Sequence, residues 1–565
     1  MTTLPDQAAQ AGLSPSPGAL LLRRTLVLVI LVRVLVALLL PFTGDEAYYY
    51  YWGAYPAFAY YDHPPMVGWL MAPVVALGMA PGWLRMPALL LVFALAWMVR
   101  RLASSAGPVR ADLAAVCVLL VPAELFNVLT TTDTPLVLFS VASLLAYQRA
   151  LQQVVAGGAV INRWHVLAGL LLGAAFMSKY FAVLLGLAYL VFALSAPRRQ
   201  RPWAGFLIVT ALALPWALAN AWGNYEHCWL NILFNVENRS DNVHLSPGLF
   251  ATYLGCLVYL TSPLVLWHLV RHAAAGIHRW RGAQGGAPVA ARAADAGAST
   301  RCLSLRADGT RWIVVCAFVV PLVLLGAVAT VRSVGLHWPL AFTPLAFVLA
   351  AFCLPERAQR ADVIYLSVLS ALHAVVFAVI GLLPLETWKA NRIYDGLVLT
   401  VKADELLALL EPWRDRYVFA TDGYSNSVTL GYQARRAAGR SGADAAKLDF
   451  LVFGPGSAHG RQQDVFDDFR ALDGRDILIV RKTAPLAAEY DPCFETVDYS
   501  SVVLRGVTFH VIRGHAFRYE TYRDRVLTVV RDRFYHRPAW LPQGHCFFCE
   551  RYFGAAGGTP VVPAH

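Results

Sequence analysis

The sequence predicts a polytopic α-helical membrane protein that carries a soluble α/β domain in its C-terminal part. Of its 565 residues, 58% are hydrophobic and only 15% are charged, and the mean hydropathy is +0.51. A soluble protein of this size could not bury so much apolar surface, so most of the chain is expected in lipid. The second observation is a change near Leu383, after which charged residues become frequent and apolar segments shorten to strand length.

Apolar runs of membrane-spanning or near-spanning length recur about eleven times before residue 384. These runs lie at roughly 21–40, 83–99, 112–129, 135–151, 164–177, 180–195, 203–220, 248–270, 312–331, 337–354 and 362–383. An odd number of crossings would place the two ends of the chain on opposite sides of the membrane. The run from Pro65 to Leu77 is shorter and follows an aromatic segment, so it is interpreted as an interfacial helix and not as a crossing.

The basic residues between the runs predict the orientation. Gaps on one side are rich in arginine and include Arg100, Arg101, Arg163 and the stretch 271–311, whereas gaps on the other side hold only a few cations. Because cytoplasmic loops carry the excess of Lys and Arg, the N-terminus is expected in the cytoplasm. The outward loops are then 41–64, 130–134, 221–247 and 332–337. The net charge of +11 therefore reflects topology rather than a nucleic-acid surface, and 271–311, rich in Ala, Gly and Arg, is expected to be a flexible cytoplasmic linker.

The chain divides into a transmembrane domain, residues 1–384, and a soluble domain, residues 385–565, which is large enough to bury its own core. Helical and strand patterns alternate in this second part. Helices are expected at 403–410, 427–435 and 463–471, and strands at 417–420, 449–453, 477–481 and near 495–512. This alternation predicts a small α/β sandwich on the outer side of the membrane.

The first outward loop is crowded with acidic and aromatic residues. Asp45 and Glu46 open the segment that ends at Trp52, and Asp62 and His63 follow shortly after. Tyrosines at headgroup level are the ordinary anchor belt of a membrane protein, so the tyrosines alone indicate nothing more. A carboxylate pair at the end of a span, however, must be hydrated, paired or metal-bound, and this predicts a functional site.

Further polar residues lie on the same predicted face. Asp133 precedes Pro135 at the next outward turn, where it could equally cap a helix, and both roles can coexist. Lys179 interrupts an apolar stretch of about thirty residues, and a turn at the outer face is less costly than a lysine in lipid. Glu237, Arg239 and His337 are found in later outward loops, where a single charged residue or His is usually only solvated.

Together, these outward acids and cations favour glycosyl transfer from a phosphate-linked donor. A carboxylate can accept the proton of an acceptor hydroxyl or hold a metal ion, while a cation stabilises the charge that appears on the departing phosphate. Two other classes of protein stay open. A transporter or lipid flippase also has many spans and intramembrane charge, although no internal repeat is visible, and a receptor or scaffold would act through its outer domain and tolerate a change at Asp45.

At these residues the chain resembles the bacterial branch of the protein O-mannosyltransferase superfamily, which includes aminoarabinose and related lipid A glycosyltransferases of the C-type fold. The motifs are DEAYYYYW at 45–52, YYDHPPMVGWL at 60–70, TTDTPLVLF at 131–139, MSKY at 177–180, FNVENR at 234–239 and GLHWPLAF at 335–342. The resemblance implies an inverting transfer of a sugar from a polyprenyl phosphate to an envelope acceptor, such as lipid A, at the periplasmic face of the inner membrane. A protein acceptor is the alternative within the same fold.

The resemblance also implies roles for individual residues. Asp45 would be the principal catalytic carboxylate, with Asp133 as its partner and Glu46 in support, and His63 would lie near the donor phosphate. The implied phosphate and substrate contacts further include Lys179, Arg239, Tyr49, Tyr61 and His337. A divalent ion could be held by Asp62, Glu237 or Asp133. Tyr48 and Asn238 stand where the aminoarabinose enzymes carry Arg and His, so the transferred sugar is left open.

Near the C-terminus, Cys546 and Cys549 form a Cys-x-x-Cys pair on the predicted oxidising side. A structural or local disulfide is expected there, with metal binding as the alternative, since a closed zinc site normally needs four ligands. Cys228 lies beside an apolar run and is interpreted as a small buried hydrophobic residue.

Overall fold

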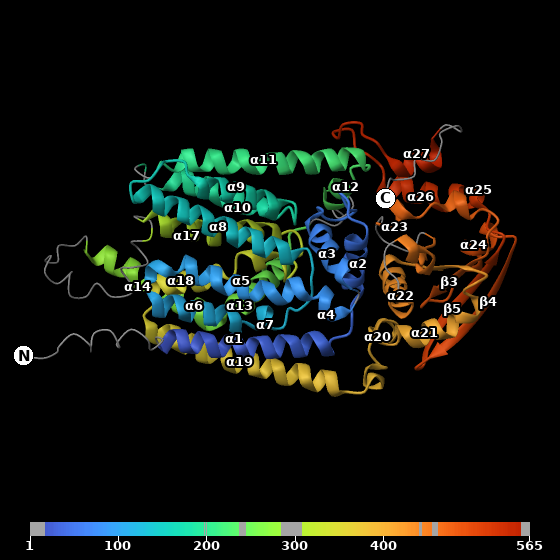
Figure 1. Cartoon of the computed structure of the whole chain (residues 1–565), viewed down its shortest axis with the longest axis horizontal. Coiled ribbons are helices and arrows are strands. Elements are labelled where there is room, and N and C mark those ends of the chain that lie inside the picture. Colours follow the sequence, from blue (N-terminus) through green and yellow to red (C-terminus); the bar gives the residue numbers. More distant parts are fainter. Residues whose placement is uncertain are drawn as a thin grey trace, which may run out of the picture.

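Long helices form a bundle along the longest axis of the molecule, and an α/β domain covers one end of that bundle (Figure 1). The computed structural model describes residues 17–78, 80–196, 198, 201–236, 244–283, 305, 308–439, 443–454 and 462–554. The bundle contains α1 (Pro17–Leu39), α5 (Met86–Leu102), α6 (Pro108–Leu120), α8 (Asp133–Val155), α9 (Arg163–Phe176), α10 (Ala182–Ser195), α11 (Pro202–Glu226), α13 (Pro247–Thr261), α14 (Pro263–Ala283), α17 (Gly309–Ala329), α18 (Leu345–Cys353) and α19 (Glu356–Leu382).

Several of these helices are long and apolar enough to cross a membrane. By length and composition the described residues contain five such helices, or up to seven if two bent helix pairs each count as one span. The shorter apolar helices α9 and α10 have 14 residues each, which is fewer than a straight crossing usually needs. The number of about eleven crossings therefore stays a prediction. The run after Pro65 forms α3 (Met66–Leu77), a short helix of 12 residues as expected.

The stretch 271–311 is partly helical. Helix α14 continues to Ala283, so the expectation of a flexible linker is wrong for the beginning of this stretch, and α17 begins at Gly309 near its end. Residues 284–304 and 306–307 lie outside the described residues. Ala and Arg are strong helix formers, so the Ala and Arg content of residues 271–283 favours continuation of the helix.

A sharp bend separates α1 from α2 (Gly44–Ala54), whose axes differ by 92°. Arg85, whose side chain is fully buried, holds this bend from the inside. Its guanidinium donates to the carbonyl oxygens of Ala37 at 2.5 Å, Leu40 at 2.9 Å and Pro41 at 3.0 Å. It also forms a two-pronged ion pair with Glu46, at 2.6 and 2.8 Å. One side chain thus satisfies carbonyl groups that a helix end leaves without partners and fixes the start of the next helix.

A second buried arginine organises the loop that precedes α8. Arg33, on α1, donates to the carbonyl oxygens of Glu124, Leu125 and Asn127, and to that of Ala88 on α5. The first three of these carbonyl groups lie in or just after the short helix α7 (Pro122–Leu125). A buried backbone carbonyl without a hydrogen-bond partner is destabilising. Arg33 supplies the missing partners and so stabilises this irregular segment inside the bundle.

The C-terminal domain is built around a five-stranded sheet with the order β2-β1-β3-β5-β4. Its strands are β1 (Val418–Thr421), β2 (Leu451–Val452), β3 (Ile477–Arg481), β4 (Thr496–Leu504) and β5 (Val507–His515). Strands β1, β2 and β3 are parallel, and β4 and β5 form an antiparallel hairpin. The surrounding helices are α20 (Tyr394–Val401), α21 (Ala403–Leu410), α22 (Tyr424–Ala437), α23 (Gln463–Phe466), α24 (Ala487–Tyr490), α25 (Tyr519–Tyr522), α26 (Thr528–Phe534) and α27 (Phe547–Phe553). The predicted α/β alternation corresponds to these elements, although the expected helix 463–471 is shortened to α23 and a 3₁₀ turn.

Helix α22 of this domain packs against α2 of the membrane part (Figure 1). The ring of Tyr432 stacks on Phe42 with centroids 4.2 Å apart. Arg435 forms an ion pair with Asp449 at 2.6 Å and donates to the Tyr55 hydroxyl at 2.7 Å. Aromatic and charged contacts therefore hold the α/β domain on the helix that carries Asp45.

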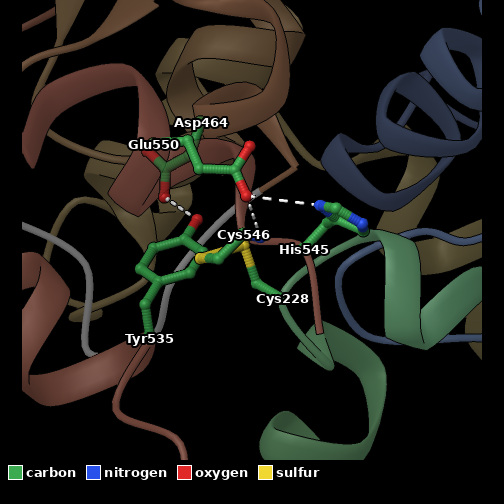
Figure 2. The surroundings of a disulfide bond; sticks show 6 residues. All are labelled: Cys228, Asp464, Tyr535, His545, Cys546 and Glu550. Atoms are coloured by element: carbon green, nitrogen blue, oxygen red, sulfur yellow. Dashed lines mark hydrogen bonds and ion pairs between the residues drawn. A yellow bond between two sulfur atoms is a disulfide. The ribbon is translucent and has the colours of Figure 1, made fainter. Parts of the chain in front are cut away.

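A disulfide joins the two parts of the chain a second time. Figure 2 shows Cys546 bonded to Cys228, which follows α11, across 318 residues of sequence. The backbone amide of Cys228 also donates to the His545 carbonyl at 2.8 Å. The expectation of a structural disulfide is therefore confirmed for Cys546, whereas a local bridge to Cys549 is wrong, as is the interpretation of Cys228 as a simple hydrophobic residue. Cys549 lies on α27 as a free thiol, and the spatial closeness of segments so far apart in sequence gives no local signal.

Replacement of Arg85 by Gln is expected to lower the stability of the folded protein by about 3–5 kcal/mol, because Glu46 would be left buried without its partner. The thermal midpoint of the purified protein in detergent measures this effect. Arg416→Gln, which breaks an exposed ion pair with Asp476, is the matched control and should cost less than about 1 kcal/mol. Equal midpoints for the two variants would contradict the role of Arg85.

The disulfide predicts a labelling pattern for three cysteines. Under denaturing but non-reducing conditions, a maleimide should label Cys549, whereas Cys228 and Cys546 should react only after reduction. Peptide mass spectrometry resolves the three positions. A Cys549→Ser variant should leave the Cys228–Cys546 peptide unchanged. Recovery of a Cys546–Cys549 peptide would contradict the observed pairing.

Candidate active site

A cavity of about 470 Å³ gathers residues from segments that are far apart in sequence. Six of the sequence-predicted residues line it, namely Asp45, Tyr49, His63, Asp133, Lys179 and His337. The other lining residues are Pro122, Ala123, Phe126, Asn127, Leu129, Thr131, Thr132, Tyr259, Leu260, Leu336, Leu340, His373 and Phe377. The wall thus combines a polar side with a broad apolar side, and all of these residues belong to the membrane part of the chain.

Asp133 and Lys179 form a buried ion pair in this wall. The ammonium of Lys179 lies 2.9 and 3.1 Å from the two carboxylate oxygens of Asp133, and the two residues are only 6% and 7% exposed. Asp133 is the first residue of α8, and its backbone amide donates to the Thr131 hydroxyl at 3.3 Å. The N-cap position of α8 is Thr132 and not Asp133, and both carboxylate oxygens of Asp133 accept from Lys179, so the geometry favours ion pairing over the helix-capping alternative. The turn that carries Lys179 is also held in place. The backbone amide of Met66 donates to the carbonyl oxygen of Met177, two residues before the lysine.

Asp45 opens into the cavity from the first turn of α2. It has no ion pair among the described residues, and its side chain is exposed to the cavity. Partial removal of the Asp45 carboxyl from water raises its pKa above the ordinary value, and repulsion from the neighbouring Glu46 carboxylate raises that pKa further. Helix α2 bends away from α1 by 92°, so Asp45 lies beyond the straight helix α1. Such a carboxylate is a suitable general base, because a raised pKa makes it a stronger proton acceptor.

Glu46 points away from the cavity. Its carboxylate accepts hydrogen bonds from the amide of Thr43 at 3.0 Å and from the Thr43 hydroxyl at 3.1 Å, and the Thr43 hydroxyl accepts from the Glu46 amide. This is a capping box at the start of α2. With the Arg85 ion pair added, Glu46 is only 3% exposed. The structure therefore places it as a support for the helix that presents Asp45, and not as a residue in contact with a ligand in the cavity.

The remaining predicted residues have other positions. The amide of Tyr61 donates to the Gln462 side chain of the α/β domain at 2.7 Å, and its ring packs on Phe234. Asp62 accepts from the Tyr48 hydroxyl at 3.4 Å. Neither Tyr61 nor Asp62 lines the cavity. Glu237 and Arg239 lie outside the described residues.

The sequence interpretation missed residues on the apolar side of the cavity. His373 on α19 and Tyr259 on α13 line it, with their side chains 3.2 Å apart. Phe126 stacks near the His373 ring, with centroids 6.4 Å apart. A histidine inside a long apolar run was the available signal, because a polar ring at membrane depth usually faces a cavity or a partner.

A metal site finds little support in the described part of the chain. No group of three or more His, Cys, Asp or Glu side chains that could hold an ion occurs among the residues that the structure describes. Of the residues expected to bind a metal, Asp133 is engaged by Lys179 and Asp62 lies outside the cavity wall. Glu237, the third expected ligand, lies outside the described residues, so the metal site stays a prediction.

Comparison with known proteins identifies a matching sequence family, a curated relative and similar solved structures. Residues 62–222 match the family described as dolichyl-phosphate-mannose-protein mannosyltransferase. The lipid A galacturonosyltransferase RgtD of Rhizobium johnstonii is 28% identical over 239 residues, which are 41% of this chain and 49% of that protein. The chain thus covers about half the length of this curated relative.

Among solved structures, ArnT from Cupriavidus metallidurans bound to undecaprenyl phosphate has a TM-score of 0.55 and 14% identity, covering 88% of this chain and 98% of that chain. The apo state of the same protein has a TM-score of 0.54 and 15% identity, covering 86% and 97%. This likeness shows that the helical bundle and the C-terminal sheet domain follow the same fold. The chain is therefore similar to the mannosyltransferase family over residues 62–222 and shares the fold of ArnT.

These matches agree with the resemblance that the loop motifs indicated, and the described residues contain several helices long and apolar enough to cross a membrane. Asp45, Asp133 and Lys179, which come from separate segments of the chain, line one cavity. The lining of that cavity therefore includes a carboxylate without an ion pair among the described residues, an ion-paired ammonium and apolar side chains.

Proposed function

We propose that the chain is an inverting glycosyltransferase that moves a sugar from a polyprenyl phosphate to an envelope glycolipid or glycan. The observation that carries the proposal is the shared cavity, in which Asp45 lies without an ion-pair partner among the described residues while Lys179 is held by Asp133. An unpaired base and a held cation in one water-accessible cavity are the two groups that this transfer uses.

Each group has a stated part in the transfer. The carboxylate of Asp45 accepts the proton of the acceptor hydroxyl while the oxygen of that hydroxyl attacks the anomeric carbon of the donor sugar. The bond from that carbon to the phosphate oxygen breaks, and the electron pair leaves with the phosphate. The ammonium of Lys179 stabilises the added negative charge. Asp133 acts as a positioning residue, because its two oxygens hold the ammonium in place.

The apolar wall supports a lipid-linked donor. Phe126, Leu260 and Phe377 line the cavity beside its polar residues, and such a wall suits the isoprenoid chain next to the phosphate. The solved ArnT structure carries undecaprenyl phosphate, which supports the same donor class here. The relative RgtD acts on lipid A, so lipid A is the acceptor class that we favour. A protein hydroxyl is the second candidate, favoured by the mannosyltransferase family that matches residues 62–222.

The cavity belongs on the periplasmic side of the bacterial inner membrane in this proposal. The arginine-rich gaps lie at the other end of the spanning helices, and the excess of basic residues favours the cytoplasmic side. Helix α2, which carries Asp45, contacts α22 of the α/β domain, so the domain and the cavity share one side. The α/β domain is then periplasmic.

Asp45→Asn is expected to reduce transfer by about 10²–10⁴-fold, because an amide cannot accept the proton of the acceptor hydroxyl. The measurement is mass spectrometry of envelope lipids and glycans from a strain that lacks the gene, in which one glycosyl mass should disappear. The wild-type gene should restore that mass and the Asp45→Asn gene should not, at equal protein levels in the membrane. Asp404→Asn, an exposed acid on α21, is the matched control and should restore it. Full restoration by Asp45→Asn would refute the proposed base.

Asp133→Asn and Lys179→Met are expected to impair transfer to a similar degree, about 10²-fold or more, because the two side chains act as one unit. The transfer rate of the double variant should lie within a few-fold of the rates of the single variants. Initial rates in membranes with equal protein content measure this. Losses that multiply in the double variant would show independent roles and contradict the assignment of Asp133 to positioning.

A further inference from the structure

A second pocket lies at the opposite end of α8 from the candidate active site. Its volume is about 450 Å³, and it is formed where the ends of α5 and α8 meet the start of α9. The wall contains three arginines, Arg101, Arg149 and Arg163, together with Trp97 and Trp164. The transfer chemistry uses none of these residues, and the pocket shares no residue with the first cavity.

No acidic side chain among the described residues neutralises the positive charge of this pocket. None of the three arginines has an ion pair with an acid within the part of the chain that the structure describes. Arg149 donates to the Gln152 side chain at 3.2 Å, which orients the guanidinium without compensating its charge. Three like charges around one pocket repel one another, so a bound anion would relieve a cost that the protein alone leaves in place.

The aromatic residues mark the depth of the pocket relative to the membrane. The guanidinium of Arg101 lies 5.5 Å from the Trp97 ring, and that of Arg163 lies 5.6 Å from the Trp164 ring. Trp97 is 53% exposed although it belongs to the spanning helix of residues 81–102. An exposed tryptophan near the end of a span is typical of the level at which lipid headgroups meet hydrocarbon.

Helix α8 gives the separation between the two pockets. Its first residue, Asp133, lines the active-site cavity, while Gln152 and Gln153 in its last turn line the basic pocket. Its 23 residues correspond to about 34 Å at 1.5 Å per residue. This length is close to the hydrocarbon thickness of a bilayer, about 30 Å. The basic pocket therefore lies in the opposite leaflet from the active site.

From these observations we infer that the pocket of Arg101, Arg149 and Arg163 binds the phosphate headgroup of an anionic glycerophospholipid. The guanidinium groups supply donors for the phosphate oxygens, and the apolar faces of Trp97, Leu145 and Trp164 contact the upper part of the acyl chains. A basic pocket between spanning helices is a known physical solution for such headgroups. The lipid would fasten the ends of α5, α8 and α9 together at the surface away from the chemistry.

Native mass spectrometry of the purified full-length protein tests this site with dioleoyl-phosphatidylglycerol as the probe and dioleoyl-phosphatidylcholine as the neutral comparison. The wild-type protein should retain phosphatidylglycerol in preference to phosphatidylcholine. In the double variant Arg101→Gln/Arg163→Gln, the affinity for phosphatidylglycerol should fall by about 10-fold or more. Both arginines are exposed, so the double variant should fold, and an unchanged thermal midpoint without lipid verifies this. Addition of Arg149→Gln to this double variant should weaken the retention of phosphatidylglycerol further.

The matched control is Arg357→Gln/Arg360→Gln, which removes the same charge from exposed positions on the first turns of α19. This control should keep the wild-type affinity. Equal losses in the two double variants would indicate general attraction to a basic surface and overturn the site, as would unchanged retention in Arg101→Gln/Arg163→Gln. Inorganic phosphate at the same concentration should not compete with the lipid; full competition would overturn the assignment to a lipid headgroup in favour of a free phosphate.

Discussion

The turn from α1 into α2 depends on one buried guanidinium. A helix that stops inside a protein leaves carbonyl groups without partners, and a carboxylate beneath the surface of a membrane protein needs a cation. Arg85 meets both needs, since it donates to carbonyl oxygens at the end of α1 and pairs with Glu46 at the start of α2. The direction of α2, and with it the position of Asp45, follows from this arrangement. The α/β domain then packs on the helix so placed, through Tyr432 and Arg435.

The three acids that the sequence put forward for catalysis have distinct electrostatic environments. Glu46 is neutralised by Arg85 and Asp133 by Lys179, and both ion pairs are nearly excluded from solvent. Asp45 is adjacent to Glu46 in sequence yet faces the cavity, because successive residues of a helix point in different directions. Two of the carboxylates are thus paired with buried cations, while Asp45 has no ion pair among the described residues. The electrostatic environment of each acid is therefore set by its partners and not by its residue type.

Much of the fold could be predicted because membrane segments and alternating α/β patterns are local signals. Apolar runs indicated the helices, and the spacing of acids and cations on one predicted face indicated that Asp45, Asp133 and Lys179 would meet. Features that depend on distant partners could not be predicted in this way. The bond between Cys228 and Cys546 joins segments with no shared pattern, and the role of Glu46 depends on Arg85, which the sequence presents only as one basic residue in a gap. His373 was overlooked since its apolar neighbours concealed it within an ordinary span.

Helix α8 connects the chemistry to the thickness of the surrounding bilayer. Its N-terminal residue is fixed by the Lys179 ion pair, and its last turn reaches the headgroup level of the other leaflet. A rigid rod anchored at both ends cannot shorten, so a thinner membrane must be matched by tilt or by local deformation of the lipid. Tilt would change the depth of Asp133 relative to the interface where a carrier phosphate resides. Under the proposed function, the thickness of the membrane would therefore set the depth at which the reaction takes place.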